Sequence, residues 1–277
     1  MSLFNRRFWP HLIVFLLLPG WSIAGEAQNA FNDGIKFYKA AKYKDAVGAF
    51  SRAIKASPPA DEAYNNRGLA YFKLGQTDNA VKDYDEALRL NDKLTDAYFN
   101  RGNAYFAQKQ YDRALKDYDE LIKADPKMPR AYRQRGLTHN ALGQFENAVA
   151  DFNQAQKLDP KDAEIYYSRG VAYRRLGKSE QAVHDYSEAL KLDPKNTEAF
   201  NNRANAYSLL GKYDEAVKDY DAALKLDPDS AKIYANRGVI RTRQGKTDEA
   251  QKDFRKALEL DPKLKDSVEP FLTPQRK

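Results

Sequence analysis

Small, aromatic and polar residues follow one another along most of this chain in a pattern that repeats every 34 residues. Seven blocks align without insertion or deletion: 27–60, 61–94, 95–128, 129–162, 163–196, 197–230 and 231–264. Position twenty is always alanine: Ala46, Ala80, Ala114, Ala148, Ala182, Ala216 and Ala250. Position twenty-four is always aromatic: Phe50, Tyr84, Tyr118, Phe152, Tyr186, Tyr220 and Phe254. This period indicates a stack of similar units, because one such unit cannot bury its apolar face alone.

Helix-terminating residues divide each block in two. Glycine lies where a left-handed cap would end a first helix: Gly75, Gly143, Gly177, Gly211 and Gly245. A Leu-Asp-Pro triplet would end the second helix, because proline disfavours helical geometry in the residue before it. The triplets lie at 158–160, 192–194, 226–228 and 260–262. We therefore expect an all-α fold of seven helix–turn–helix units, whose small residues at positions eight and twenty allow close helix contact.

These positions resemble the tetratricopeptide repeat, a helix–turn–helix unit of the same length. The resemblance covers residues 27–264 and implies a right-handed α-solenoid of seven tandem repeats. The segment 265–277 follows the last repeat and reads as a short C-terminal cap or tail. We expect its Val268, Phe271 and Leu272 to cover the last repeat.

Residues 1–24 resemble a cleavable export signal. Arg6 and Arg7 precede an apolar run at 12–18, and Ser22 and Ala24 end the segment with small residues. Pro19 and Gly20 are expected to break any helix in between, with cleavage after Ala24. The alternative is an uncleaved membrane anchor, but the run is shorter than the roughly 20 apolar residues that a spanning helix needs. The repeats would then occupy 25–264 of an exported protein, and a Gram-negative host would place it in the periplasm.

Composition narrows the chemistry. The chain has no cysteine and three histidines, none of them in a pair with metal-ligand spacing. Its net charge of +7 comes from basic residues that are interspersed with acids, unlike the basic stripe of a nucleic-acid-binding protein. A mean hydropathy of −0.78 suits an elongated stack. The sequence predicts no cofactor, no metal, no catalytic site, no nucleic-acid partner and no stable membrane insertion after signal cleavage.

Paired charges recur in units two to seven. Position seven is arginine in all six: Arg67, Arg101, Arg135, Arg169, Arg203 and Arg237. Position twenty-three is aspartate in the same six: Asp83, Asp117, Asp151, Asp185, Asp219 and Asp253. The first unit has neither. We expect an ion pair that ties the two helices of a unit together; the alternative is a ladder of arginines available to a ligand.

The resemblance also implies a concave face lined by positions two, five, six, nine, twelve and thirteen of the first helices. Aromatic residues occupy some of these positions in the N-terminal half: Phe31, Tyr38, Phe72, Phe99 and Phe106. Arginines occupy others in the middle: Arg130, Arg133, Arg174 and Arg175. The aromatic residues either bind a partner or pack between helices. The arginines either bind an acidic partner or form a solvated face.

Asparagine recurs at position six of five units: Asn32, Asn66, Asn100, Asn202 and Asn236. This series resembles the asparagine ladder with which some tetratricopeptide proteins hold a peptide backbone, since an amide can donate to a carbonyl and accept from an N–H. The alternative is that each asparagine bonds the neighbouring helix. The carboxylate clamp of other family members is absent, because no unit combines lysine at position five with asparagine at position nine.

Together these features favour a scaffold or adaptor of the cell envelope that binds a protein or peptide along the concave face, with an acidic segment as one candidate partner. The predicted contact residues are Phe72, Phe99, Phe106, Asn66, Asn100, Arg130, Arg133, Arg174, Arg175, Asn202 and Asn236. The alternative is a structural solenoid that associates with itself through its ends, because short caps leave apolar ends exposed. An enzyme is disfavoured.

Overall fold

The computed structural model describes residues 19–56 and 60–272, and within them the chain is all-helical. By its internal contacts the chain divides into two compact units, residues 1–104 and 105–277. The helices follow one another in consecutive helix–turn–helix pairs, as the repeat pattern predicts, so the expected all-α solenoid class is confirmed.

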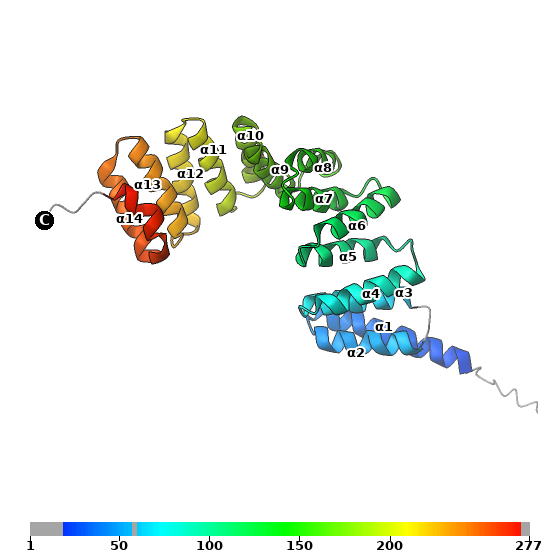
Figure 1. Ribbon diagram of the computed structural model, residues 1–277. Helices are drawn as coiled ribbons and strands as arrows, with labels where there is room; N and C mark the ends of the chain where they lie inside the picture. The colour runs from blue at the N-terminus through cyan, green and yellow to red at the C-terminus, as the bar shows by residue number, and fades with distance from the viewer. Residues whose placement is uncertain (1–18, 57–59, 273–277) are drawn as a thin grey trace, which may run out of the picture. The chain divides into compact units, whose positions relative to one another are not determined.

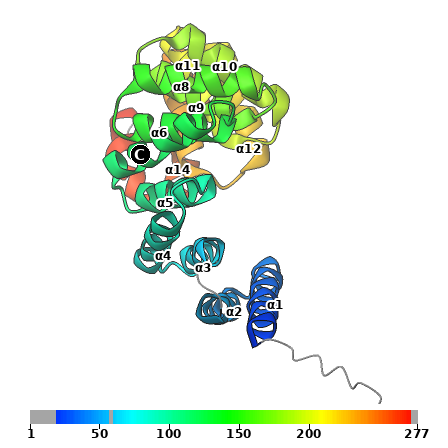
Figure 2. The ribbon, with the colours of Figure 1, turned by 90° about the vertical axis from the view of Figure 1, so that its right-hand side faces the viewer.

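The first compact unit contains α1 to α4 and most of α5. Its helices are α1 (Pro19–Lys39), α2 (Tyr43–Ala56), α3 (Asp61–Lys73), α4 (Thr77–Leu90) and α5 (Thr95–Ala107), the last of which continues into the second unit. Helices α1 and α2 lie side by side, blue in Figures 1 and 2. Ala46, Phe50 and Ala70 form one of its buried clusters.

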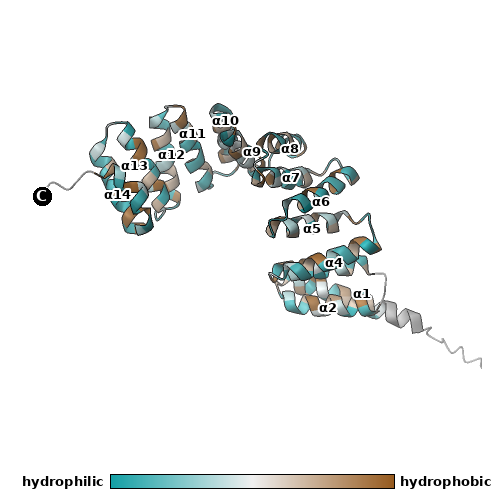
Figure 3. Cartoon of the chain, in the orientation of Figure 1, coloured by the Kyte–Doolittle hydropathy of each residue, from teal (hydrophilic) through white to brown (hydrophobic). Residues whose placement is uncertain are grey.

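The second compact unit contains the other helix pairs. They are α6 (Tyr111–Ala124), α7 (Pro129–Ala141), α8 (Phe145–Leu158), α9 (Ala163–Arg175), α10 (Ser179–Leu192), α11 (Thr197–Leu209), α12 (Tyr213–Leu226), α13 (Ala231–Arg243) and α14 (Thr247–Leu260). Helices α7, α9, α11 and α13 are the first helices of their repeats, and each contacts the next. The helices carry both hydrophilic and hydrophobic residues in Figure 3, as expected where each buries only part of its surface.

Helix α1 includes residues that the sequence assigned to the export signal. The described part of α1 begins at Pro19, so Pro19 and Gly20 lie in the same helix as the start of the first repeat. The expected cleavage position after Ala24 therefore lies within α1. Residues 1–18, which hold the charged and apolar parts of the expected export signal, lie outside the described residues.

Helix ends form where the sequence predicts them. The five glycines at position fifteen have φ between 72° and 75°, in the left-handed region that glycine adopts without strain. In the two units without glycine there, Ala41 and Lys109 adopt φ of 57° and 59°. The second helices α8, α10, α12 and α14 each end at the leucine of a Leu-Asp-Pro triplet.

The core is a repeated contact between a small residue and a ring. In five units a side chain on the glycine at position eight would meet the aromatic ring at position twenty-four; a Cβ on Gly170 would lie 2.8 Å from the ring of Tyr186. Ala204 takes this position in the sixth unit and is itself fully buried. The rings at position twenty-four are buried throughout, which explains why only small residues face them.

The segment after α14 folds back onto the last repeat. It consists of η1 (Pro262–Leu264), α15 (Lys265–Val268) and η2 (Glu269–Phe271). Val268 is only 2% exposed and clusters with Ala250 and Phe254, against which Leu272 also packs. The ring of Phe271 stacks on that of Phe254 at 5.5 Å. This segment covers apolar surface that the last repeat would otherwise expose.

Candidate functional site

The arginine at position seven joins two repeats. In the second unit, Arg67 donates from Nε and Nη2 to both carboxylate oxygens of Asp83, each at 2.7 Å, and the same bidentate pair forms around Arg135, Arg169, Arg203 and Arg237. The predicted pairing within a repeat is therefore confirmed in these five units. The third donor, Nη1, reaches back to position twenty-five of the preceding repeat. Its acceptors are Ser51, Asp85, Asp119, Asn153, Ser187 and Asp221.

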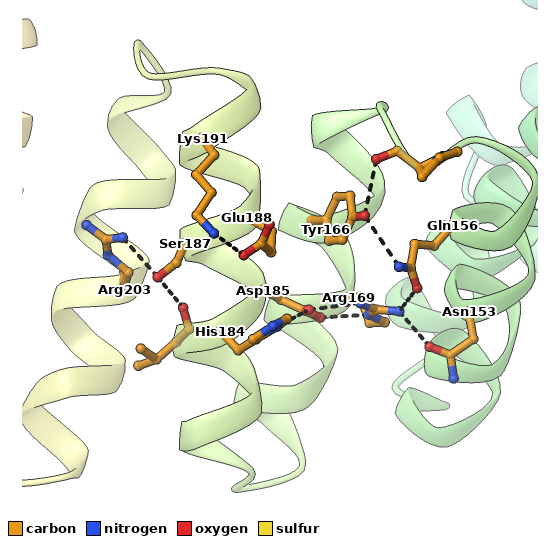
Figure 4. A network of polar contacts seen from close by, with 12 residues as sticks. Asn153, Gln156, Tyr166, Arg169, His184, Asp185, Ser187, Glu188, Lys191 and Arg203 are labelled. Atoms are coloured by element: carbon orange, nitrogen blue, oxygen red, sulfur yellow. Dashed lines mark hydrogen bonds and ion pairs between the residues drawn. The ribbon is translucent and has the colours of Figure 1, made fainter.

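Figure 4 shows this arrangement around Arg169. Its guanidinium contacts Asp185 on one side and Asn153 and Gln156 on the other, with Nη1 at 2.7 Å from Asn153 Oδ1. Arg169 also lies over the ring of Tyr166, at 5.6 Å from its centroid. Bidentate hydrogen bonds to Asp83 raise the pKa of Arg67 above its ordinary value, which illustrates how firmly such a charge is held. These arginines bind their own chain, so they do not form a ladder that is open to ligand.

The predicted contact residues of the first compact unit are partly buried. Asn66 donates to its own helix at Glu62 O over 2.8 Å, and Asn100 donates to Asn65 Oδ1 at 3.0 Å. Phe72 packs against the buried cluster of Ala80, Tyr84 and Ala104. Phe99 is also partly buried. The aromatic residues therefore contribute to packing between helices, the alternative that the sequence left open.

The three other aromatic positions also pack against rings of the following helix. Phe31 meets Phe50 edge to face at 5.6 Å, and Tyr38 meets Tyr43 at 5.4 Å. Phe106, in the second compact unit, meets Tyr111 at 5.5 Å.

The four central arginines do not form one patch of equivalent charges. Arg133 donates from Nη1 to Asp162 Oδ2 at 2.6 Å, so a carboxylate already offsets its charge. Arg175 lies over the ring of Phe145, at 5.4 Å from the centroid, and Arg174 is partly buried. Arg130 is exposed at the start of α7. A ligand would meet Arg130 and Arg175 more readily than Arg133.

An amide network crosses α9, α11 and α13. Asn202 donates from Nδ2 to the Tyr167 hydroxyl at 3.0 Å, and that hydroxyl donates to Glu198 Oε2 at 2.9 Å. One helix further on, Asn236 donates to Asn201 Oδ1 at 3.1 Å. Asn202 and Asn236, both at position six, therefore bond the neighbouring first helix with one amide hydrogen each. The contacts use only part of the capacity of each amide, which has two donors and an acceptor.

A hollow of about 350 Å³ lies beside this network. Its walls come from first helices α9, α11 and α13 and from the turn between α12 and α13. The lining residues are Tyr167, Thr197, Glu198, Asn201, Asn202, Asp227, Ser230, Lys232 and Ile233. Its volume is within the range of about 300–1,000 Å³ that is typical of ligand pockets.

The sequence singled out only Asn202 of these lining residues. Glu198 and Lys232 occupy position two, and Tyr167 and Asn201 occupy position five, both among the positions read for the concave face. The others were missed because residue types that recur at one position were selected, and these residues do not recur. Comparing the same position in three consecutive units would have revealed the polar cluster.

Other kinds of site are not evident in the described part of the chain. Within residues 19–56 and 60–272, no group of three or more His, Cys, Asp or Glu side chains is arranged to hold a metal ion. No helix in that same part has both the length and the apolar character needed to cross a membrane.

Solved structures share the fold. A tetratricopeptide repeat protein from Parabacteroides merdae is 21% identical, with a TM-score of 0.66 over 90% of this chain and 98% of that one. The C-terminal part of a repeat-containing protein from Cytophaga hutchinsonii is 20% identical, with a TM-score of 0.71 over 88% and 100%. YrrB, described as a tetratricopeptide repeat protein with an unusual peptide-binding site, is 22% identical, with a TM-score of 0.58 over 72% and 98%.

Family membership follows from the sequence match. No curated protein matches the chain. One family model does, over residues 26–267, and it is described as the cilia and flagella-associated protein 70 C-terminal domain, a tetratricopeptide-repeat domain. The match spans every repeat, and the structure supplies the helix pairs that such repeats form. The chain therefore belongs to this tetratricopeptide-repeat family.

Proposed function

We propose that this protein is a non-catalytic scaffold or adaptor that binds a segment of a partner protein across the first helices α9, α11 and α13. The observation that carries the proposal is the polar hollow beside Asn201 and Asn202. Amide side chains suit an extended peptide, because they can donate to a backbone carbonyl and accept from a backbone N–H. YrrB, which shares the fold, is described as having a peptide-binding site.

The other predicted contact residues of the second compact unit lie on neighbouring first helices. Asn236, Arg174 and Arg175 lie on the same series of first helices, and Arg130 and Arg133 lie on α7. Asn66, Phe72, Phe99 and Asn100 belong to first helices of the other compact unit, where they would contact a partner independently of this surface. Interspersed charges favour a protein partner over nucleic acid.

Selection of displayed random peptides on the immobilised full chain would test the proposal. We expect defined peptides to be enriched, and the double variant Asn202→Ala/Asn236→Ala to bind them about 30-fold more weakly, since each of the two lost hydrogen bonds contributes on the order of 1 kcal/mol. Asn147→Ala is the matched control, because Asn147 is an exposed asparagine on the second helix α8. Failure to enrich any peptide, or equal binding by the double variant and the control, would contradict the proposal.

We also propose that residues 1–24 direct export, to the periplasm in a Gram-negative cell. The support is the sequence alone: a basic start, a short apolar run and small residues before Gly25. Expression in a Gram-negative host, followed by N-terminal sequencing of the periplasmic fraction, should return Gly25 as the first residue. A full-length chain in the cytoplasm would contradict the proposal.

Self-association through the ends has less support. It was suggested by the short segment after residue 264, but Val268 and Leu272 of that segment pack on the last repeat. A monomer across a wide concentration range is the expected result in sedimentation experiments.

A further inference from the structure

We propose that the hollow between α9, α11 and α13 accepts a basic side chain, lysine or arginine, of the bound segment. This inference rests on the proposed peptide-binding function and specifies the chemistry of the same site. It also separates this hollow from the arginines on α7 and α9, which suggested an acidic ligand.

The hollow holds two carboxylates that have no cation of their own. Glu198 and Asp227 line it, and neither forms an ion pair within the described residues. Glu198 accepts a hydrogen bond from Tyr167 on one oxygen, which fixes the carboxylate on the wall of the hollow. A carboxylate held in place by a neighbour is a suitable acceptor for an ammonium or guanidinium group, because its orientation is set before the ligand arrives.

The surroundings add negative charge. Glu164 lies at the start of α9, with its residue exposed overall. Partial desolvation raises the pKa of its carboxyl, the hydrogen bond from Ser168 and the charge of Arg133 lower it, and the charges of Asp162 and Glu198 raise it. Burial and the hydrogen bond to Glu198 likewise raise the pKa of the Tyr167 phenol, so this hydroxyl keeps its proton and remains a donor. Arg133 of α7, whose charge acts on Glu164, pairs with Asp162. The local field therefore favours a positive ligand.

A buried amide offers the second contact. Asn201 is only 8% exposed, and its oxygen accepts from Asn236. Its Nδ2 donates to no acceptor within the described part of the chain and keeps contact with solvent, so this donor is open to a ligand. Because Asn201 lines the hollow, a carbonyl of the bound segment could accept from it. One peptide residue would then place its carbonyl at Asn201 and its basic side chain at Glu198 and Asp227.

Lys232 is the only basic residue in the lining and provides an internal competitor. It is exposed on the first turn of α13 and forms no ion pair among the described residues. Its ammonium group would repel a basic ligand, so its removal should strengthen the binding that removal of Glu198 weakens. Two substitutions in one hollow therefore have opposite expected effects.

The test uses decapeptides enriched by random-peptide selection on the full chain, synthesised with acetylated and amidated ends. We expect them to share a lysine or arginine at one position, and its replacement by glutamine to weaken binding about 10-fold. Glu198→Gln should lower the affinity for the basic peptide by a similar factor and leave the affinity for the glutamine peptide unchanged. Lys232→Gln should raise the affinity for the basic peptide. Affinity for the basic peptide should also fall with salt, as for any partly exposed ion pair.

Enriched peptides that depend on Asn202 and Asn236 but share no basic residue would overturn this inference alone. Equal affinity of Glu198→Gln and the unaltered chain for the basic peptide would overturn it too, once circular dichroism shows the variant to be folded. If no peptide is enriched, the proposed function and this inference both fail. Charge reversal provides a further check: Glu198→Lys should bind the peptide whose basic residue is replaced by glutamate.

Discussion

At the scale of single residues, the buried ring at position twenty-four differs between repeats in whether it carries a hydroxyl and whether that hydroxyl is hydrogen-bonded. Phe50, Phe152 and Phe254 fill it without a polar atom, and tyrosines fill it elsewhere. The hydroxyl of Tyr220 donates to Asn205 Oδ1 at 2.7 Å, whereas the buried hydroxyl of Tyr84 has no hydrogen-bond partner in the described chain. The same side chain is therefore satisfied in one repeat and unsatisfied in another.

The two tyrosines should respond differently to loss of the hydroxyl. Tyr84→Phe removes an unpaired buried polar group, so we expect it to leave stability unchanged or to raise it by up to about 1 kcal/mol. Tyr220→Phe removes a hydrogen bond, so we expect a loss of about 1 kcal/mol. Urea unfolding of both variants, monitored by circular dichroism, measures the difference. Equal losses in both would contradict the contrast.

Breaking the buried arginine–aspartate pair should lower the free energy of unfolding more than either tyrosine substitution does. Asp185→Asn leaves Arg169 buried without its counter-charge, and breaking a buried pair from one side costs about 3–5 kcal/mol. Glu86→Gln, which breaks an exposed pair with Arg89 on α4, should change stability little. Replacing both members of the buried pair, with Arg169→Met and Asp185→Leu, should recover most of the loss. A small effect of Asp185→Asn in urea unfolding would show that water reaches this guanidinium.

At the scale of helices and turns, the sequence predicts most of the structure because each helix end has a local cause. Glycine at position fifteen and proline after the second helix act on their own neighbours, so reading them needs no knowledge of the fold. The placement of Pro19 and Gly20 within α1 was not foreseen, since both residues were read as helix breakers. The reach of each position-seven arginine to the preceding repeat was also missed, because its acceptors at position twenty-five are serine, aspartate or asparagine.

The site was harder to predict than the helices for a related reason. The sequence places Arg133 on an inward position, but only the structure brings Asp162, in the turn between α8 and α9, to it. The hollow depends on three helices and on residues that do not recur, such as Tyr167, Glu198 and Lys232. Periodicity identifies what all repeats share, whereas a binding site lies where neighbouring repeats differ.

The turn after α5 tests the role of glycine at a helix end. Lys109 adopts φ of 59°, where a side chain costs about 1–2 kcal/mol relative to the right-handed region. Lys109→Gly should therefore stabilise the chain by up to about 1 kcal/mol, after the extra freedom that glycine gives the unfolded chain is subtracted. Gly143→Ala, at the equivalent turn after α7, should have the opposite sign. Thermal unfolding of both variants would check this, and destabilisation by both would contradict it.

At the scale of the whole molecule, stability is approximately a sum over similar units. The effects of a group that recurs in several repeats therefore add up in the stability of the whole chain. Tyr84, Tyr118, Tyr186 and Tyr220 are all buried at position twenty-four. Burial raises the pKa of Tyr84, Tyr118 and Tyr220, and raises that of Tyr186 to about 12. In the unfolded chain these phenols ionise near a pKa of about 10.

Above pH of about 10 the unfolded chain therefore loses protons that the folded chain keeps, so the free energy of unfolding falls as pH rises. Each tyrosine that stays protonated contributes a slope of at most about 1.4 kcal/mol per pH unit. Urea unfolding between pH 9 and pH 11.5 should show this decline, which Tyr186→Phe reduces and the converse change Phe152→Tyr increases. A slope that neither substitution alters would place the alkaline sensitivity outside these rings, and the repeated core would then contribute no pH dependence.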